Sequence, residues 1–385
     1  MTKIYLDSAS TTPVCAVAKQ AAINAIENFG NPSSMHKMGL SAEKEISAAR
    51  EAIARAINAK PSEIYFTAGG TEANNMAIFG GAKLPIGAGL VTTPVEHSSV
   101  KYPIMALEQR GFKMFHVEHF GGGAVNSDSL KAVLAQAAPV SLVSIHHVHN
   151  ETGVIQDIAA LARIVKEACP EALFHVDAVQ AFCKVPIDVR AIAVDLMSFS
   201  AHKLGGLKGC GALFVREKVH VAPLILGGGQ EGGFRSGTEN VPGIAAFGAV
   251  AKERYDRLRE NFEYVGGLKS RFLEAIVGVD GIDINGENAS PYILNISVAG
   301  VRPEVLLNAL SAQEVYISAG AACSSNKKQK KLEEAVLTAY GLPAERAQTA
   351  VRISFSPENT LDEITRAAGI FEKCVGDLRK MRKLR

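Results

Sequence analysis

The sequence has little net charge. Its 385 residues carry 41 Lys and Arg against 39 Asp and Glu, a formal charge of +2 with neutral histidines. This balance argues against a protein whose main partner is a polyanion such as nucleic acid. With 47% hydrophobic and 21% charged residues, the composition is that of a globular protein. The length predicts two or three domains, or one large α/β domain with a smaller companion.

Three other features are missing. The six cysteines, at positions 15, 169, 183, 210, 323 and 374, form no CxxC pair of the kind that begins a zinc or redox site. Scattered cysteines are typical of the reducing cytosol, so we predict a cytoplasmic protein. The sequence has no run of about 18 apolar residues, and its first residues lack the apolar core of a secretory signal. We therefore expect neither a membrane span nor export.

Hydrophobic periodicity predicts an α/β fold. Short runs rich in β-branched and aromatic residues alternate with longer alanine-rich stretches, which is typical of a parallel sheet flanked by helices. Seven strands are expected, at 64–67, 90–93, 113–117, 141–146, 172–177, 195–199 and 212–215. Helices are expected at 16–28, 42–58, 72–80, 99–110 and 158–168.

A second, smaller unit follows. A long helix expected over 241–262 leads into it, and strands at 293–298 and 351–355 frame its helices. We predict a large domain, 14–255, with a mostly parallel seven-stranded sheet, and a small α+β domain formed by 1–13 and 256–385.

One lysine stands where ligand sites of open α/β sheets form, beyond the carboxyl end of a strand. Lys203 closes the tetrapeptide SAHK, directly after the strand expected at 195–199. Such a lysine forms a Schiff base when its charge is suppressed by burial or by a neighbouring cation, for example a protonated His202. Because most lysines lie on the surface, Lys203 alone is a weak candidate. The motifs near it in the fold are what make a functional role more convincing.

Two further segments end or follow strands at the same predicted edge. Asp177 ends the strand expected at 172–177, and an aspartate there can hold a pyridine nitrogen protonated, as pyridoxal phosphate requires. The alternative is a helix N-cap. Gly70 and Thr71 open a helix after a strand, so free backbone N–H groups and a hydroxyl suit a phosphate. This turn is not a Walker loop, because it lacks the GK[ST] ending.

Histidines gather near this edge as well. His97 follows the second strand, where an imidazole can stack on a cofactor ring, although a structural role is commoner. His146, His147 and His149 resemble a metal site in their density, but strand alternation points the first two to opposite faces, so we expect no metal. Asn150 is a better candidate for hydrogen bonding a ligand.

Seven motifs stand in one order along nearly the whole chain. They are YLDSASTTP at 5–13, GNPSS at 30–34 with His36, HNETG at 149–153, HVDAVQ at 175–180, SAHK at 200–203, GGGQE at 227–231 and RSGTEN at 235–240. With them the sequence resembles the class V aminotransferase family of pyridoxal phosphate enzymes, and within it the cysteine desulfurases of the NifS and IscS kind. The resemblance implies a fold-type I pyridoxal phosphate transferase.

The resemblance also implies roles for single residues. Lys203 would carry the cofactor, Asp177 would pair with its pyridinium nitrogen, Gln180 would bond its ring hydroxyl and His97 would stack on the ring. Arg352, helped by Asn150, would bind the substrate carboxylate, for which the planar guanidinium fork is suited. The phosphate would be held by Gly70, Thr71, Ser200 and His202, and by Thr238 from the other subunit of a homodimer.

Cys323 decides the reaction that we expect. It lies among small residues that suit a mobile loop, and the basic segment 327–331 would favour its thiolate, the nucleophilic form. The family's SGSACxS pattern falls on it, with Ala319 and Ala321 in place of two serines. By resemblance, L-cysteine is converted to L-alanine and a persulfide on Cys323, with the nucleophile on a loop of the small domain.

Some alternatives stay open. Segment 326–331, Gly232 and Leu207 depart from the family pattern, so the sulfur acceptor, whether an iron–sulfur scaffold or a tRNA-thiolation enzyme, is undetermined. The basic segment either meets an acidic acceptor or RNA, or is a solvated face, which is commoner. A class V aminotransferase would not need Cys323, a selenocysteine lyase would prefer selenium, and a degenerate scaffold would bind no cofactor.

Overall fold

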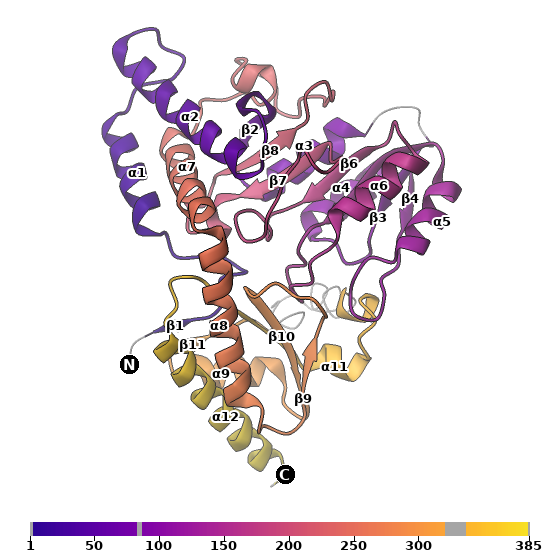
Figure 1. The fold of residues 1–385 in the computed structure, drawn as a ribbon, viewed down its shortest axis with the longest axis vertical. Helices are drawn as coiled ribbons and strands as arrows, with labels where there is room; N and C mark the ends of the chain where they lie inside the picture. Colours follow the sequence, from indigo (N-terminus) through magenta and orange to yellow (C-terminus); the bar gives the residue numbers. More distant parts are fainter. Residues whose placement is uncertain (1–2, 83–86, 320–335, 384–385) are drawn as a thin grey trace.

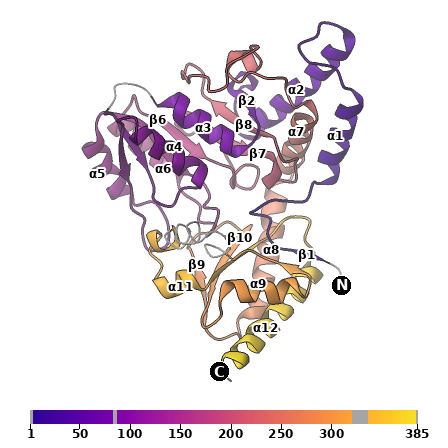
Figure 2. The ribbon, with the colours of Figure 1, turned by 180° about the vertical axis from the view of Figure 1, so that it is seen from behind.

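The computed structural model describes residues 3–82, 87–319 and 336–383. Figure 1 shows a large α/β part above a smaller part, with helices α7 (Val241–Asp256) and α8 (Leu258–Ile276) running from one into the other. Both ends of the described chain lie by the smaller part, as the view from behind also shows (Figure 2). None of the helices in these ranges combines the length and apolar composition needed to cross a membrane.

The large part is built on one seven-stranded sheet in the order β2-β8-β7-β6-β5-β3-β4. Strand β8 runs antiparallel to both of its neighbours, and the other pairs are parallel. The predicted mostly parallel sheet is therefore confirmed. The strands are β2 (Ile64–Thr67), β3 (Gly89–Thr92), β4 (Lys113–His116), β5 (Val140–His146), β6 (Leu173–Asp177), β7 (Leu196–Ser200) and β8 (Gly211–Val215).

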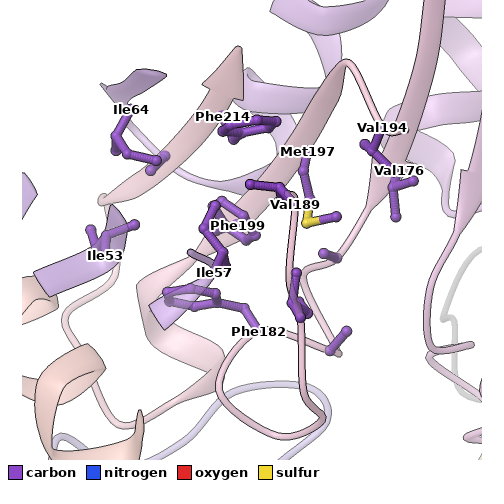
Figure 3. Close-up of a cluster of buried hydrophobic side chains, with 14 of the residues drawn as sticks. Ile53, Ile57, Ile64, Val176, Phe182, Val189, Val194, Met197, Phe199 and Phe214 are labelled. Carbon is purple, nitrogen blue, oxygen red and sulfur yellow. The ribbon is translucent and has the colours of Figure 1, made fainter. Parts of the chain in front are cut away.

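Helices cover both faces of this sheet. The buried cluster on one face joins the strands to α1 (Ala16–Glu27), α2 (Lys37–Ala56), α5 (Ser127–Ala137), α6 (Ile158–Ala168) and α7. The cluster on the other face joins them to α3 (Gly70–Gly81) and α4 (Ser98–Glu108). Side chains alternate between the two clusters along each strand, as in Leu196 and Met197, because successive strand residues point to opposite faces. Figure 3 shows Met197 and Phe199 packed near Ile57 beyond the end of α2.

The smaller part has a separate core. An antiparallel sheet in the order β12-β10-β9 packs with α8, α9 and α12, and the N-terminal strand β1 pairs with β11. Its elements besides α8 are β1 (Ile4–Tyr5), β9 (Ile282–Asn285), β10 (Ile293–Val298), α9 (Pro303–Ser311), β11 (Val315–Tyr316), α11 (Ala344–Gln348), β12 (Ala350–Ser354) and α12 (Leu361–Lys383). Because the core takes in Ile4 and Leu6 but nothing from 10–264, we propose the division into domains 14–255 and 1–13 with 256–385.

Three helices differ from expectation. The helix expected over 241–262 is two helices, because the backbone of Arg257 (φ −113°, ψ 19°) leaves the helical region between α7 and α8. Helix α2 begins at Lys37 rather than 42, where the His36 ring accepts a hydrogen bond from the Gly39 N–H. Helix α5, which the periodicity did not predict, is capped by the Asn126 side chain.

Phe272 tests how far the smaller part depends on its own core. Its ring is fully buried and contacts Phe355 and Phe371 edge-on. Phe272→Ala leaves a cavity at this point, so we expect the free energy of unfolding to fall by about 3–5 kcal/mol in urea titrations. Val277→Ala, at a site 86% exposed, serves as control and is expected to change it by less than ~0.5 kcal/mol. Equal effects of the two substitutions would contradict the assigned core.

Candidate functional site

Three strands bring polar groups to one edge of the large sheet. In the parallel register His146 of β5 lies opposite Asp177 of β6, and Asp177 lies opposite Ser198 of β7. Strand β7 ends at Ser200, and the short 3₁₀ helix Ala201–Lys203 follows at once. Lys203 is thus placed beyond the carboxyl end of its strand, next to Asp177, where such sheets form ligand sites.

The amine of Lys203 is held by backbone. Its Nζ donates to the carbonyl oxygens of Ala9 (2.7 Å) and Ser10 (2.6 Å). Burial, and then the positive charge of Arg352, lower its pKa from 10.5 to about 8. A substantial fraction of the amine is therefore neutral, and nucleophilic, near neutral pH.

His202 does not supply the cation that we suggested for this effect. Burial and the positive charges of Lys203, Lys208 and Lys184 lower its pKa to about 4, so the ring is neutral near pH 7. That suggestion was wrong because burial, and then the nearby lysines, disfavour the charged ring. Its Nδ1 lies 3.1 Å from Thr11 Oγ1, and its backbone carbonyl accepts from Thr12 Oγ1 (2.9 Å).

The carboxylate of Asp177 is buried and held by two donors. Oδ1 accepts from the Val179 N–H (3.0 Å), and Oδ2 accepts from Asn74 Nδ2 (2.8 Å). The first contact is that of an Asx turn; a turn and not a helix follows Asp177, so the helix N-cap alternative does not apply. Among residues 3–82, 87–319 and 336–383 it has no ion-pair partner within 4.0 Å. A buried carboxylate without a cation fits a ligand that brings a positive charge.

A hydrogen-bonded path that sequence reasoning missed leads from Asp177 to His97. Asn74 Nδ2 also donates to Ser99 Oγ (2.8 Å), and Ser99 Oγ lies 2.7 Å from His97 Nδ1. His97 itself is exposed at the start of α4. Asn74 stands one helical turn after Gly70, on the same side of the helix. That spacing was the only feature of the sequence that could have indicated a place for Asn74 in the site.

The start of α3 lies against the same edge. A Cβ added to Gly70 would come within 2.6 Å of Val179 Cγ2 and 3.4 Å of Ser200 Cβ, so only glycine lets these three segments meet. The first-turn N–H groups of a helix, here from Gly70 and Thr71, suit an anion. Ser200 is buried beside them, and Thr71 is exposed.

Arg352 of β12 joins this edge from the smaller part. Its Nη1 donates to Glu151 Oε1 (2.7 Å) and to the Asn150 carbonyl (2.9 Å), and its Nη2 donates to Asp7 Oδ1 (3.1 Å) and Ser10 Oγ (2.7 Å). Burial alone would lower its pKa, but Glu151 and Asp7 outweigh burial and raise it. Asp7 and Glu151 were assigned no role from the sequence, although both lie inside quoted motifs.

Two predicted site residues are not joined to this cluster. Thr238 lies exposed between the 3₁₀ helix Glu231–Gly233 and α7, and no hydrogen bond within the described part of the chain connects it to Lys203 or its neighbours. Cys323 lies outside the described residues.

The three histidines at the end of β5 and just after it are buried and contact other protein groups. His146 Nδ1 lies 2.8 Å from Glu96 Oε1, and burial first of all lowers the pKa of His147 to about 4 and that of His149 well below its ordinary value. Within the described ranges, no three His, Cys, Asp or Glu side chains are grouped so that they would hold a metal ion.

The lowered pKa of Lys203 predicts how its amine reacts. Only the neutral amine acylates, and with a pKa of about 8 roughly a tenth is neutral at pH 7. After removal of bound small molecules, we expect acetylation of the Lys203 peptide, followed by mass spectrometry, to reach half its maximal rate near pH 8. Nα-acetyl-lysine, whose side-chain amine is free, is the reference in the same reaction. Its rate should reach half of its maximum at about pH 10.4. A half-point near that reference would contradict the burial of the amine.

Comparisons with known proteins agree with this geometry. The family model for aminotransferase class-V matches residues 4–367. A cysteine desulfurase IscS of Neisseria meningitidis serogroup C (strain 053442) is 38% identical over 391 aligned residues, which cover 100% of this chain and 95% of that protein.

Solved structures agree as well. A NifS-like protein has a TM-score of 0.90 and 34% identity, covering 98% of this chain and 100% of that one. The structure of SspA in complex with cysteine has a TM-score of 0.79 and 34% identity, covering 93% and 100%. The family resemblance read from the motifs is thus confirmed, and the chain belongs to the class-V aminotransferase family and, within it, to the cysteine desulfurases.

Proposed function

We propose that this chain converts L-cysteine to L-alanine with pyridoxal phosphate and keeps the sulfur as a persulfide on Cys323. The observation that carries the proposal is the pair formed by Lys203, whose pKa is lowered to about 8, and Asp177, a buried carboxylate without a cation among the described residues. The class-V aminotransferases and the cysteine desulfurases are pyridoxal phosphate families. The relative SspA has been solved in complex with cysteine.

The residues present fit the cofactor. Lys203 would supply the amine for its attachment, Asp177 an anion for the ring nitrogen, and Gln180 an amide for the ring oxygen, and His97 would stack on the ring. When bound, the cofactor supplies an electron sink for the substrate α-carbon. The phosphate would be held by Gly70, Thr71, Ser200 and His202, and the close approach of Val179 and Ser200 to Gly70 leaves little room there for a side chain.

The substrate carboxylate is assigned to Arg352 and Asn150. Since Glu151 and Asp7 already occupy the guanidinium fork, the substrate has to exchange with one of them or join at an open side of the fork. This requirement favours a small ligand whose carboxylate makes two parallel hydrogen bonds to the guanidinium. A ligand that makes a single hydrogen bond competes less well. The neutral amine of Lys203, once free, is placed to take the α-proton.

The sulfur step belongs to Cys323. Its thiolate attacks the substrate sulfur, an S–S bond forms, and the C–S bond breaks with its electron pair going to the carbon fragment. That fragment takes up a proton and leaves as alanine, so cysteine and one protein thiol give alanine and one persulfide. A sulfur acceptor, such as an iron–sulfur scaffold or a tRNA-thiolation enzyme, then removes the outer sulfur.

We also propose a homodimer in which Thr238 completes the phosphate site of the partner copy. Large apolar side chains are exposed around the α1–α2 turn and on the loop before α7: Phe29 (77%), Met35 (94%) and Leu226 (80%). Residues 32–33 and 228–232 line one open hollow of about 330 Å³, so the two segments lie side by side. Large apolar side chains exposed on two neighbouring segments favour an interface with a second copy.

A cytoplasmic location is part of the proposal. Cys15, Cys169, Cys183, Cys210 and Cys374 are free thiols in the described part of the chain. Several free thiols in one chain are usual for a protein of a reducing compartment.

Cys323→Ser tests the nucleophile. We expect the variant to keep the visible absorbance of the bound cofactor and to lose alanine release from cysteine by at least about a hundredfold, because serine cannot form a persulfide. Cys374→Ser, on α12, is the matched control and is expected to retain wild-type rates. Wild-type protein treated with cysteine should gain the mass of one sulfur on the Cys323 peptide. Unchanged alanine release by Cys323→Ser would overturn the assignment, and pyridoxamine phosphate formed with a keto acid would indicate an aminotransferase.

Arg352→Lys tests the carboxylate site. The lysine keeps the charge between Asp7 and Glu151 but loses the bidentate fork, so we expect KM for cysteine to rise about tenfold or more. Arg216→Lys is the control, since Arg216 is partly buried and donates to the carbonyls of Val189, Ile192 and Val194 away from Lys203. An unchanged KM in Arg352→Lys would exclude Arg352 as the carboxylate ligand.

A further inference from the structure

A second buried lysine lies beside Lys203. Lys184 ends the turn that follows β6, and its backbone N–H bonds to the Ala181 carbonyl (2.9 Å). Only 6% of the residue is exposed. Nothing in its sequence context distinguished it from the lysines of the surface, and it takes no part in the chemistry proposed above.

The contacts of its amine are unusual for a buried lysine. Nζ donates to Gln180 Oε1 (3.1 Å) and lies 5.6 Å from the centre of the Tyr292 ring. Among the described residues it has no ion-pair partner within 4.0 Å. Burial, and then the charges of Lys203, Arg254 and Arg352, lower its pKa to about 7. Burying a lysine amine without a carboxylate partner costs desolvation free energy. A role beyond packing would explain why a lysine stands at this position.

The reason lies in the amide of Gln180. While Lys184 holds the amide oxygen, the amide nitrogen Nε2 donates to the Ala9 carbonyl (2.8 Å). A carbonyl only accepts, so these two partners fix which end of the amide faces which way. The second N–H of Nε2 is then left for a ligand. A ligand at this position therefore meets the amide N–H donor and not the amide oxygen.

The same carbonyl connects the two lysines. Ala9 O accepts from Gln180 Nε2 and also from Lys203 Nζ (2.7 Å). The two lysines line one small cavity of about 20 Å³. The other ionisable groups on that cavity are Cys183, Arg254, Tyr292 and Glu358. Lys184, Gln180, Ala9 and Lys203 thus form one continuous hydrogen-bonded series.

We propose that Lys184 is a positioning residue that fixes the Gln180 amide so that its N–H is presented to the ring oxygen of the cofactor. The proposal rests on the function proposed above, since it needs the cofactor at Lys203. It requires no charge on Lys184, because the ammonium and the neutral amine both donate a hydrogen bond to Gln180 Oε1. Without that donor, only the Ala9 carbonyl still orients the amide, so the end that faces the anionic ring oxygen is less strictly fixed.

The test is the pH titration of the visible absorbance of the cofactor-bound protein. Lys184→Met keeps the length of the side chain and removes the donor. We expect the pKa of the absorbance change to rise by about one unit, a tenfold change in proton affinity, because a lost donor destabilises the deprotonated ring oxygen. The dissociation constant of the cofactor, measured by uptake into the cofactor-free protein, should rise about three- to tenfold.

A second background separates positioning from charge. In Gln180→Ala, which has no amide to position, Lys184→Met should shift the absorbance pKa by less than a third of its effect in the wild type. Equal shifts in both backgrounds would show that Lys184 acts through its charge alone, and no shift in either would show that it only packs. Both outcomes overturn the proposal.

Controls keep the result interpretable. Lys269→Met removes another partly buried lysine, which donates to the carbonyls of Ser290 and Ile293, and should leave the absorbance pKa unchanged. If Lys184→Met does not fold, as judged by thermal unfolding, Lys184→Leu, which also lacks a donor, is titrated in the same two backgrounds. It must then shift the absorbance pKa more beside Gln180 than beside alanine. A wild-type protein without a visible band would refute the proposed function itself, before any variant is compared.

Discussion

The ion pairs of Arg352 tie the molecule together at its centre. This buried guanidinium on β12 binds Asp7, from the N-terminal segment, and Glu151, from the loop after β5, so three segments far apart in sequence meet on one side chain. Buried charges are costly to desolvate, and the cost is met only when geometry and hydrogen bonds are good. Here Ser10 Oγ and the Asn150 carbonyl accept further hydrogen bonds from its two Nη atoms, whereas its Nε is buried without a partner among the described residues. The position of the smaller part beside the sheet edge, and hence the site, depends on this arrangement.

The N-terminal segment acts as the backbone wall of the site. The Ala9 carbonyl accepts from Lys203 and Gln180, while the Ala9 N–H donates to Ser354 Oγ on β12. Thr12 bonds to the His202 carbonyl just before Lys203. A lysine amine fixed by carbonyl oxygens, without a carboxylate in contact, keeps a lowered pKa. Residues that precede the large sheet in the sequence thus supply both carbonyl oxygens that hold the amine.

The elements that the sequence predicted well are those that local periodicity determines. The strands at 64–67 and 293–298 were predicted to the residue, and the edge that carries Asp177 and Lys203 follows from the rule for parallel sheets. The break at Arg257 depends on a single backbone conformation between two helical patterns, so periodicity could not show it. Asn74 and Lys184 reach the site through side-chain contacts across the fold, Asn74 to Asp177 and Lys184 to Gln180, which spacing in one chain does not encode. The suggested protonated His202 failed for the same reason, because its neighbours in space are lysines.

Charge balance around the site explains why the cofactor and the substrate suit it. Lys203 and Arg352 face Asp7, Glu151 and Asp177, and among the described residues Asp177 alone of these carboxylates lacks a cationic contact. A ligand with a protonated ring nitrogen would supply the cation that Asp177 lacks. In the proposed function, its phosphate would meet helix N–H groups at Gly70 and Thr71, where the partial positive charge of the helix end would compensate it without a titratable group. A substrate carboxylate, in contrast, would compete with Glu151 and Asp7 for Arg352. Such a site would hold the cofactor firmly and exchange the substrate, which is what repeated turnover on one bound cofactor requires.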